Sequence, residues 1–183
     1  MSLAVDHLRL MARNNAYANE QLYAACRRLS QLEIEAERTN FFPSILQTLN
    51  HILEVDRYYI DALIEAGQGR SVYDVPALKT ALELNAAQAE CDRQLIVFCD
   101  QLNEADLTQT VQQDRGEKGV FQETIGNTLL HLFQHQIHHR GQVHAMLAGT
   151  GVASPQLDEF FLDFERHPAA VRKLEIPGRE ENL

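Results

Sequence analysis

The segment from His131 to His144 reads HLFQHQIHHRGQVH, and its pattern decides the fold class of this protein. It lies within about residues 122–148, where apolar side chains recur at the three- and four-residue spacing of one helix face. The following Gly149-Thr-Gly151 is typical of a helix end. We therefore predict a long amphipathic helix with an apolar stripe made of Ile125, Leu129, Leu132, Val143, Met146 and Leu147.

Five of the eight histidines fall in this segment, and helical phase separates them into two groups. Each residue advances by about 100° around a helix, so His139 and His135 lie about 20° and about 60° from Leu132 at the centre of the stripe. This pair is predicted to point inward. The other three lie about 100° or more from the centre, on the flanks or in solvent: His131, His138 and His144.

The inward pair has the spacing of metal ligands. His135 and His139 are one turn apart, with Cβ atoms roughly 5–6 Å apart, so two imidazoles can share one ion. The alternative is one buried histidine satisfied by a hydrogen bond, with an accidental neighbour. Catalytic metal sites commonly use three protein ligands and water, so a third ligand is expected elsewhere. His51 is a candidate, but it lies away from the main stripe of its own helix, so periodicity leaves its role open.

The rest of the chain also has the pattern of helices joined by short connections. Helices are predicted over about residues 2–29, from about Pro43 to before Gly67, and from after Pro76 to about residue 102. A shorter C-terminal helix is predicted at about residues 156–164, and residues 103–121 are either a small hairpin or a plain loop. The expected architecture is all-α: one domain over residues 1–183, a four-helix bundle with an additional short C-terminal helix, and a peripheral tail at about 168–183.

Composition and charge exclude several classes of protein. The chain of 183 residues has 26 Asp and Glu against 16 Lys and Arg, a formal net charge of −10. No nucleic-acid partner is expected, because phosphate backbones require clustered basic side chains. The longest clearly apolar run, residues 95–99, is far shorter than the roughly 20 residues that span a bilayer. No membrane partner is therefore expected.

The N-terminal sequence predicts a cytoplasmic protein, and the cysteine pattern predicts free thiols. Asp6 and Arg9 interrupt any apolar segment of a secretory signal, so a soluble, cytoplasmic chain is expected. The cysteines are odd in number and form no CxxC pair, which excludes a disulfide framework. We predict buried free thiols at Cys26, Cys91 and Cys99.

Several segments together resemble the DinB-like (DinB/YfiT-type) family of metal-dependent proteins, over nearly the whole chain. The most specific motif is His135-Gln-Ile-His138-His139-Arg140-Gly141-Gln142. Family members often carry Trp at the position of Tyr17 and Asn at that of Gln134, and neither is a ligand position. The supporting motifs are Arg13-Asn-Asn15-Ala-Tyr17-Ala-Asn19-Glu20, Thr48-Leu-Asn-His51-Ile-Leu-Glu-Val-Asp56, Gly149-Thr-Gly151 and Pro155-Gln-Leu-Asp158.

The resemblance implies a metal site formed by His51, His135 and His139 inside a four-helix bundle, in a protein that forms a homodimer. It also implies, for some relatives, a metal-dependent S-transferase or isomerase that uses a low-molecular-weight thiol. The family name refers to induction by DNA damage, and so to a stress response, but not to contact with DNA.

Imidazole ligands suit zinc, nickel or iron, and such an ion can bind a thiol as thiolate or activate water. A metal-dependent thiol transferase acting on a small-molecule substrate is the favoured expectation. One alternative is a hydrolase that uses metal-bound hydroxide. Another is a non-enzymatic, stress-related bundle whose metal is structural.

Polar side chains near the predicted site are candidate catalytic helpers. Asn15 and Asn19 lie within about 20° of the apolar stripe of the first helix. An inward amide there either orients a substrate or a ligand imidazole, or forms an interhelical hydrogen bond that fixes register. Gln142 lies about 80° from the stripe centre on the side of His135, where it could contact a ligand. Arg140 is expected to point away from the stripe and to form a surface ion pair.

Overall fold

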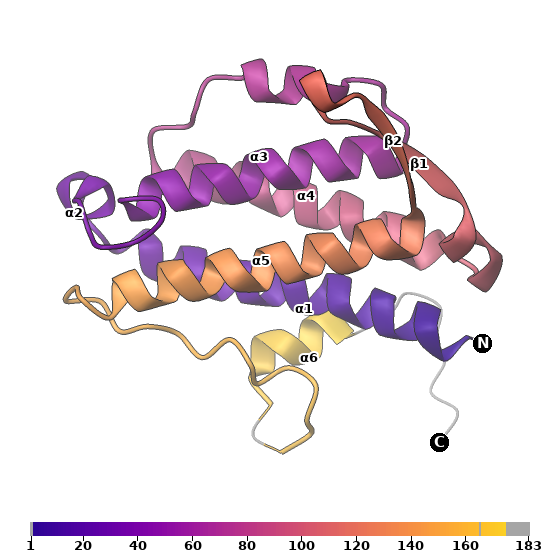
Figure 1. The fold of residues 1–183 in the computed structure, drawn as a ribbon. Coiled ribbons are helices and arrows are strands. Elements are labelled where there is room, and N and C mark those ends of the chain that lie inside the picture. Colours follow the sequence, from indigo (N-terminus) through magenta and orange to yellow (C-terminus); the bar gives the residue numbers. More distant parts are fainter. Residues whose placement is uncertain (1, 165, 175–183) are drawn as a thin grey trace.

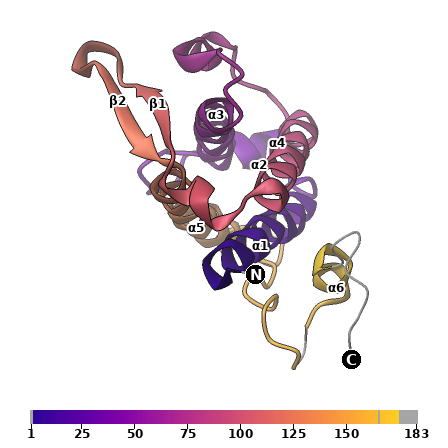
Figure 2. The ribbon, with the colours of Figure 1, turned by 90° about the vertical axis from the view of Figure 1, so that its right-hand side faces the viewer.

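Four long helices form the bundle in the computed structural model, which describes residues 2–164 and 166–174. The helices lie side by side, with both α1 and α3 packed against α4 and α5 (Figures 1 and 2). The predicted all-α fold class is confirmed, and each long helix lies inside its predicted range. Their bounds are α1 Leu3–Cys26, α3 Ile45–Leu63, α4 Ala81–Gln101 and α5 Ile125–Leu147.

Side-chain caps explain why three of these helices begin later than predicted. The hydroxyls of Ser44 and Thr124 each accept a hydrogen bond from the backbone N–H three residues further on, at 3.2 and 3.1 Å. At the start of α4, Thr80 accepts from the backbone of Glu83, and the Glu83 carboxylate accepts from the backbone N–H of Thr80. Each cap satisfies N–H groups that have no partner within the helix, which sets the first helical residue.

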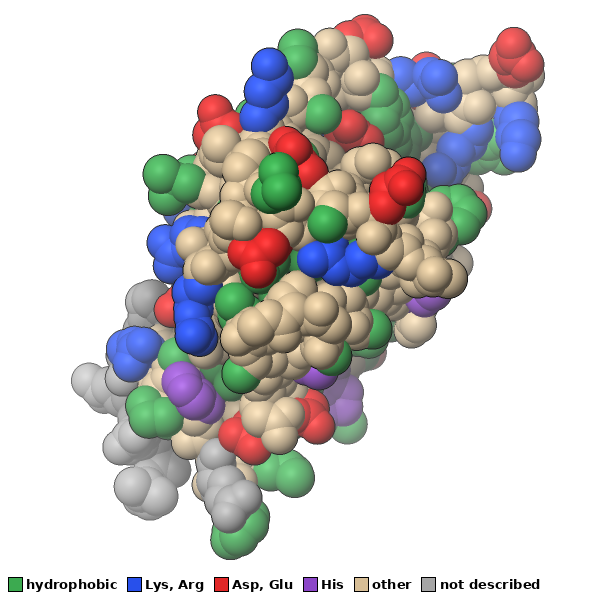
Figure 3. Space-filling view, turned by 90° about the vertical axis from the view of Figure 1, so that its left-hand side faces the viewer, with side chains coloured by type: hydrophobic (Ala, Val, Ile, Leu, Met, Phe, Trp, Pro, Cys, Tyr) green, Lys and Arg blue, Asp and Glu red, His purple; other side chains and the backbone are tan. Residues whose placement is uncertain are grey.

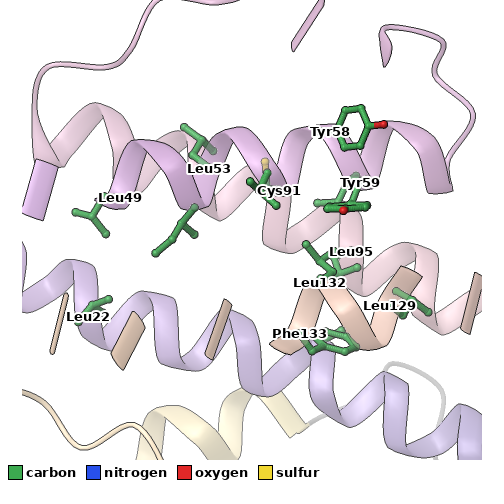
Figure 4. Packing of buried hydrophobic residues seen from close by; sticks show 14 of the residues in the cluster. Leu22, Leu49, Leu53, Tyr58, Tyr59, Cys91, Leu95, Leu129, Leu132 and Phe133 are labelled. Carbon is green, nitrogen blue, oxygen red and sulfur yellow. The ribbon is translucent and has the colours of Figure 1, made fainter. Parts of the chain in front are cut away.

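The core lies between the four long helices (Figure 4). Each buried leucine contributes about 1.5–3 kcal/mol relative to an exposed one, so this packing holds the helices at defined rotations. The labelled side chains come from all four long helices and are buried: Leu22, Leu49, Leu53, Tyr58, Tyr59, Cys91, Leu95, Leu129, Leu132 and Phe133.

The three cysteines are buried and free, as predicted. Burial raises the pKa of each thiol to about 12, so none is a thiolate near neutral pH. These thiols therefore lack the lowered pKa that is typical of a reactive cysteine.

The connection between α4 and α5 contains an antiparallel hairpin, which confirms the hairpin alternative for residues 103–121. The register pairs Thr110 with Thr124 and Asp114 with Val120. The hairpin lies on the side of the bundle formed by α3 and α5 (Figure 2). Its elements are η2 Glu104–Thr108, β1 Thr110–Asp114, η3 Gly116–Lys118 and β2 Val120–Thr124; the shorter helices α2 Gln31–Glu35 and η1 Gly69–Asp74 occur in earlier connections.

The predicted C-terminal helix at about residues 156–164 is wrong. That segment is irregular, and the short helix α6 follows it at Pro168–Leu174. The reason is tertiary: Phe160 is fully buried against Tyr17 of α1, with ring centroids 5.7 Å apart. Pro168 then suits a first helical turn. The tail predicted as peripheral thus begins with a helix that packs on α1, where Lys173 pairs with Glu20 at 2.9 Å.

The surface carries charges of both signs. On the face at the α2 end of the bundle, basic and acidic side chains are interspersed (Figure 3). Across residues 2–164 and 166–174, no helix combines the length and the hydropathy that a bilayer-spanning segment needs.

Candidate metal centre

Three histidines from two helices meet between α3 and α5. His51 lies on α3, and His135 and His139 lie one turn apart on α5. Each offers a nitrogen, and these nitrogens all lie within 4.8 Å of one another. The ring centroids are 4.9, 4.6 and 4.4 Å apart. The structure therefore brings the three predicted ligands into one group that could hold a metal ion, including His51, whose position periodicity left open.

The spacing of the imidazole nitrogens suits a shared divalent ion. Nε2 of His51 and Nε2 of His135 are 3.0 Å apart. Two imidazole nitrogens that each lie about 2.0–2.1 Å from one ion, in tetrahedral or octahedral positions, are about 2.9–3.4 Å apart. Three protein donors also leave at least one position for a small ligand.

The surroundings hold these imidazoles in the neutral form that metal binding requires. Burial, and then the neighbouring charge of His139, lowers the pKa of His51 to about 4. Burial, and then the charges of the nearby histidines, lowers the pKa of His135 to about 3. Burial also lowers the pKa of His139. At neutral pH each ring therefore has one nitrogen lone pair available to an ion.

Gln142 fixes the orientation of His139. Its Oε1 lies 2.8 Å from Nδ1 of His139, so Nδ1–H donates and the lone pair of the ring is on Nε2. Its Nε2 lies 3.2 Å from Nε2 of His138. Gln142 thus touches the candidate ligand, as its helical phase suggested, and a catalytic role for it stays a prediction.

Replacing Gln142 by alanine is expected to weaken zinc binding by about 10–100-fold, the usual loss when the partner of a ligating imidazole is removed. A competitive titration against a chromophoric chelator measures the dissociation constant. Gln134→Ala is the matched control, because Gln134 is exposed on the same helix and makes no side-chain hydrogen bond within the described chain. An unchanged dissociation constant in Gln142→Ala would mean that this hydrogen bond does not orient the ligand.

An aromatic edge borders the three histidines. The ring of Phe42 lies 4.4 Å from that of His51 and 5.8 Å from that of His139. Phe41 packs edge-on against Phe42 and is 79% exposed. The site therefore has an apolar wall on the side of the connection that precedes α3.

The three flanking histidines do not join the group of possible ligands. His131 and His138 are exposed, and His144 is half-buried, as their helical phase predicted. His144 lies 3.0 Å from the carbonyl oxygen of Pro155, which places it away from the site and against the segment that follows α5.

A buried polar network lies beside the histidines and contradicts the prediction for Arg140. This side chain is 4% exposed and is not part of a surface ion pair. Its Nη1 donates to Oδ1 of Asn15, to Oδ1 of Asn19 at 3.1 Å and to Oε1 of Gln136 at 2.9 Å. The guanidinium is buried because α1 covers this flank of α5 and supplies amide oxygens to it.

Asn15 and Asn19 use both ends of their amides within this network. Their Nδ2 atoms donate to Oδ1 of Asp92 on α4, at 3.0 and 2.9 Å. Their oxygens accept from Arg140. The contacts therefore correspond to the interhelical alternative, which fixes the register of α1 against α4 and α5.

The network reaches α3 through Asp56. Its Oδ2 accepts from Nε2 of Gln88, at 2.6 Å, and from Nε2 of Gln136. Burial, and then the charge of Asp92, raises the pKa of Asp56 to about 7, and burial raises that of Asp92 to about 6. Because Gln136 follows His135 directly, this hydrogen bond ties the two helices that carry the candidate ligands.

The sequence profile of the DinB family matches residues 1–171. The chain belongs to the DinB family. Protein DinB of Bacillus subtilis (strain 168) is 26% identical over 154 residues, which cover 79% of this chain and 86% of the relative. The crystal structure of a DinB-like protein from Bacillus cereus ATCC 10987 matches with a TM-score of 0.59 and 18% identity, over 76% of this chain and 90% of that one. This likeness shows a shared fold.

The sequence of this DinB-family chain carries a signal for the buried polar network. Asp56 lies on the apolar stripe of α3, and Asp92 lies on that of α4 next to Leu95. Gln136 lies only about 40° from Leu132 on α5. Carboxylates on apolar stripes must find buried partners, so these positions predict a shared polar core. Arg140 has no such signal, because it lies on a flank of its helix.

Proposed function

We propose that this protein is a metal-dependent thiol transferase in which His51, His135 and His139 bind a divalent ion. The observation that carries the proposal is the meeting of three neutral imidazoles from α3 and α5 with their nitrogens within 4.8 Å. Zinc, nickel or iron held there supplies a Lewis acid that lowers the pKa of a bound thiol. In the reaction, the thiol sulfur forms a bond to an electrophilic carbon, the leaving group departs with its electron pair, and the thiol proton passes to solvent.

The surrounding residues support an anionic sulfur ligand. Three neutral imidazoles bring no negative charge, so a divalent ion would leave local positive charge inside a protein whose net charge is −10. Phe42 packs beside His51 and His139 and places an apolar ring on that side of the site. Gln142 holds the tautomer of His139. These contacts favour a thiolate at the site over a bulky, strongly hydrated ligand.

A panel of thiols tests this function. The metal-loaded protein is mixed with monochlorobimane and glutathione, bacillithiol, mycothiol or cysteine, and the fluorescent thioether is followed. We expect at least one thiol to react faster than in buffer, and expect stripping of the metal to remove that rate. Turnover of an ester or amide without turnover of any thiol would instead support a hydrolase. No metal-dependent turnover of either class would support a structural metal.

The homodimer, the cytoplasmic location and the absence of a nucleic-acid partner stay predictions. The family resemblance implies a homodimer, whose mass sedimentation equilibrium would measure directly. A cytoplasmic location and the absence of a nucleic-acid partner are expected from the acidic composition and from the N-terminal sequence, as above.

A further inference from the structure

Arg115 directly follows β1 and is anchored by two hydrogen bonds, on the side of the bundle where the three histidines lie. Its Nη2 donates to the hydroxyl of Tyr59 at 2.7 Å and to Oε1 of Gln113 at 2.6 Å. Both partners are buried, and Gln113 is itself held by Thr128 of α5 at 2.9 Å. The guanidinium of an otherwise exposed residue is thus anchored to α3 and, through the hairpin, to α5.

A continuous row of rings joins Arg115 to the candidate metal ligands. The guanidinium carbon lies 5.4 Å from the ring centroid of Tyr59. Tyr59, which lies on the side of α3 that faces Leu132 (Figure 4), is 5.0 Å from the ring of His131. The ring of His131 is 6.3 Å from that of His135. Arg115 therefore lies at one end of the interface between α3 and α5, which we call the α3–α5 seam. The three histidines lie further along this interface.

The guanidinium of Arg115 has hydrogen-bond donors that no described residue uses. It forms no ion pair with any carboxylate of residues 2–164 and 166–174, and only its Nη2 donates to a described partner. An anchored guanidinium loses little side-chain entropy when a planar oxyanion binds to it through paired hydrogen bonds. Exposed His131 adds a polar ring on the same seam.

The helical rise gives an approximate distance between the three histidines and the rings of Tyr59 and His131. Tyr59 follows His51 by eight residues on α3, a rise of about 12 Å, and His131 precedes His135 by four residues, a rise of about 6 Å. We propose that Arg115, with Tyr59 and His131, binds a carboxylate of the thiol substrate while its sulfur lies at the three-histidine site. This inference rests on the proposed function, and it names the substrate class: a thiol whose carboxylate lies about 6–12 Å from the sulfur, the range that the two rises bracket.

A metal-free experiment tests the carboxylate site by itself. Octanoate is titrated into the full-length protein, and the ring resonances of His131 are followed by NMR. We expect a saturable shift in the wild type and in Lys118→Gln, an exposed cation on the same hairpin, and at least about a tenfold weaker response in Arg115→Gln. The absence of a shift in the wild type, or an equal shift in Arg115→Gln, would overturn the proposal.

A second experiment joins this site to the proposed function. With Co²⁺ bound, the sulfur-to-cobalt absorption band reports the affinity for 8-mercaptooctanoate and for its methyl ester. We expect the free acid to bind about tenfold more tightly than the ester in the wild type, and expect equal affinities in Arg115→Gln. If acid and ester bind equally to the wild type, the carboxylate assignment is wrong. If neither gives the band, the thiol function fails, and the octanoate titration still decides the role of Arg115.

Discussion

Replacement of His135 by alanine is expected to leave the purified protein with almost no bound divalent metal. The variant keeps two imidazoles, His51 and His139, which seldom suffice for a divalent ion, since catalytic sites commonly use three protein ligands. We expect the affinity for zinc to fall more than about 100-fold, beyond the usual loss for an orienting partner. Elemental analysis and competitive titration of the wild type and the variant measure this. Alanine at His51 or His139 should have the same effect.

His138→Ala is the matched control for these variants. His138 adjoins His139 in sequence but is exposed and lies outside the group of converging nitrogens. Its replacement should leave the metal content within about twofold of the wild type, because no ligand is lost. Full metal occupancy in all three ligand variants would show that the ion binds elsewhere. Equal losses in His138→Ala would show that the histidine substitutions act through the folding of α5 and not through lost ligands.

Arg140→Met is expected to destabilise the fold by about 3–5 kcal/mol, the usual cost of removing one partner from a buried charge network. The substitution keeps an unbranched apolar stem but removes the positive charge beside Asp92 and Asp56, both buried within the bundle. It also leaves the oxygens of Asn15 and Asn19 without their donor. Equilibrium unfolding in urea measures the change in the free energy of unfolding.

Two further variants show whether this loss comes from the network. Arg93→Met removes an exposed ion pair to Glu90, and because solvent screens such a pair the free energy of unfolding should stay close to that of the wild type. Adding Asp92→Asn to Arg140→Met should recover part of the stability, because it removes an uncompensated buried carboxylate. A cost below about 1 kcal/mol for Arg140→Met, or no recovery in the double variant, would contradict a charge-compensated core.

Most of the secondary structure could be predicted because its causes are local. The apolar spacing located all four long helices, and caps at Ser44, Thr80 and Thr124 account for their later starts. The sequence does not distinguish a hairpin from a plain loop at residues 103–121, since this segment carries turn signals but little alternation of polar and apolar side chains. The short C-terminal helix was misplaced, because the insertion of Phe160 beside Tyr17 depends on a contact far apart in sequence.

The residues of the candidate site likewise fall into those that local periodicity predicts and those that only the tertiary structure brings together. Helical phase placed His135 and His139 on the inward face of one helix, since both belong to a single periodic segment. His51 could be linked to them only by resemblance, because its own periodicity points elsewhere. Arg140 was predicted on the surface and is buried. Its burial depends on amides from α1, which no pattern within α5 reveals.

The histidine-rich segment thus specified a helix and two inward imidazoles without help from the rest of the chain. The packing of α3 against α5 brings the third imidazole, that of His51, to the other two. The packing of α1 against α4 and α5 brings together the buried polar groups around Arg140 and Asp92. Periodicity reports which face of a helix is apolar. Which polar groups then meet depends on the rotation and offset of neighbouring helices, which are set by side-chain packing across the whole bundle.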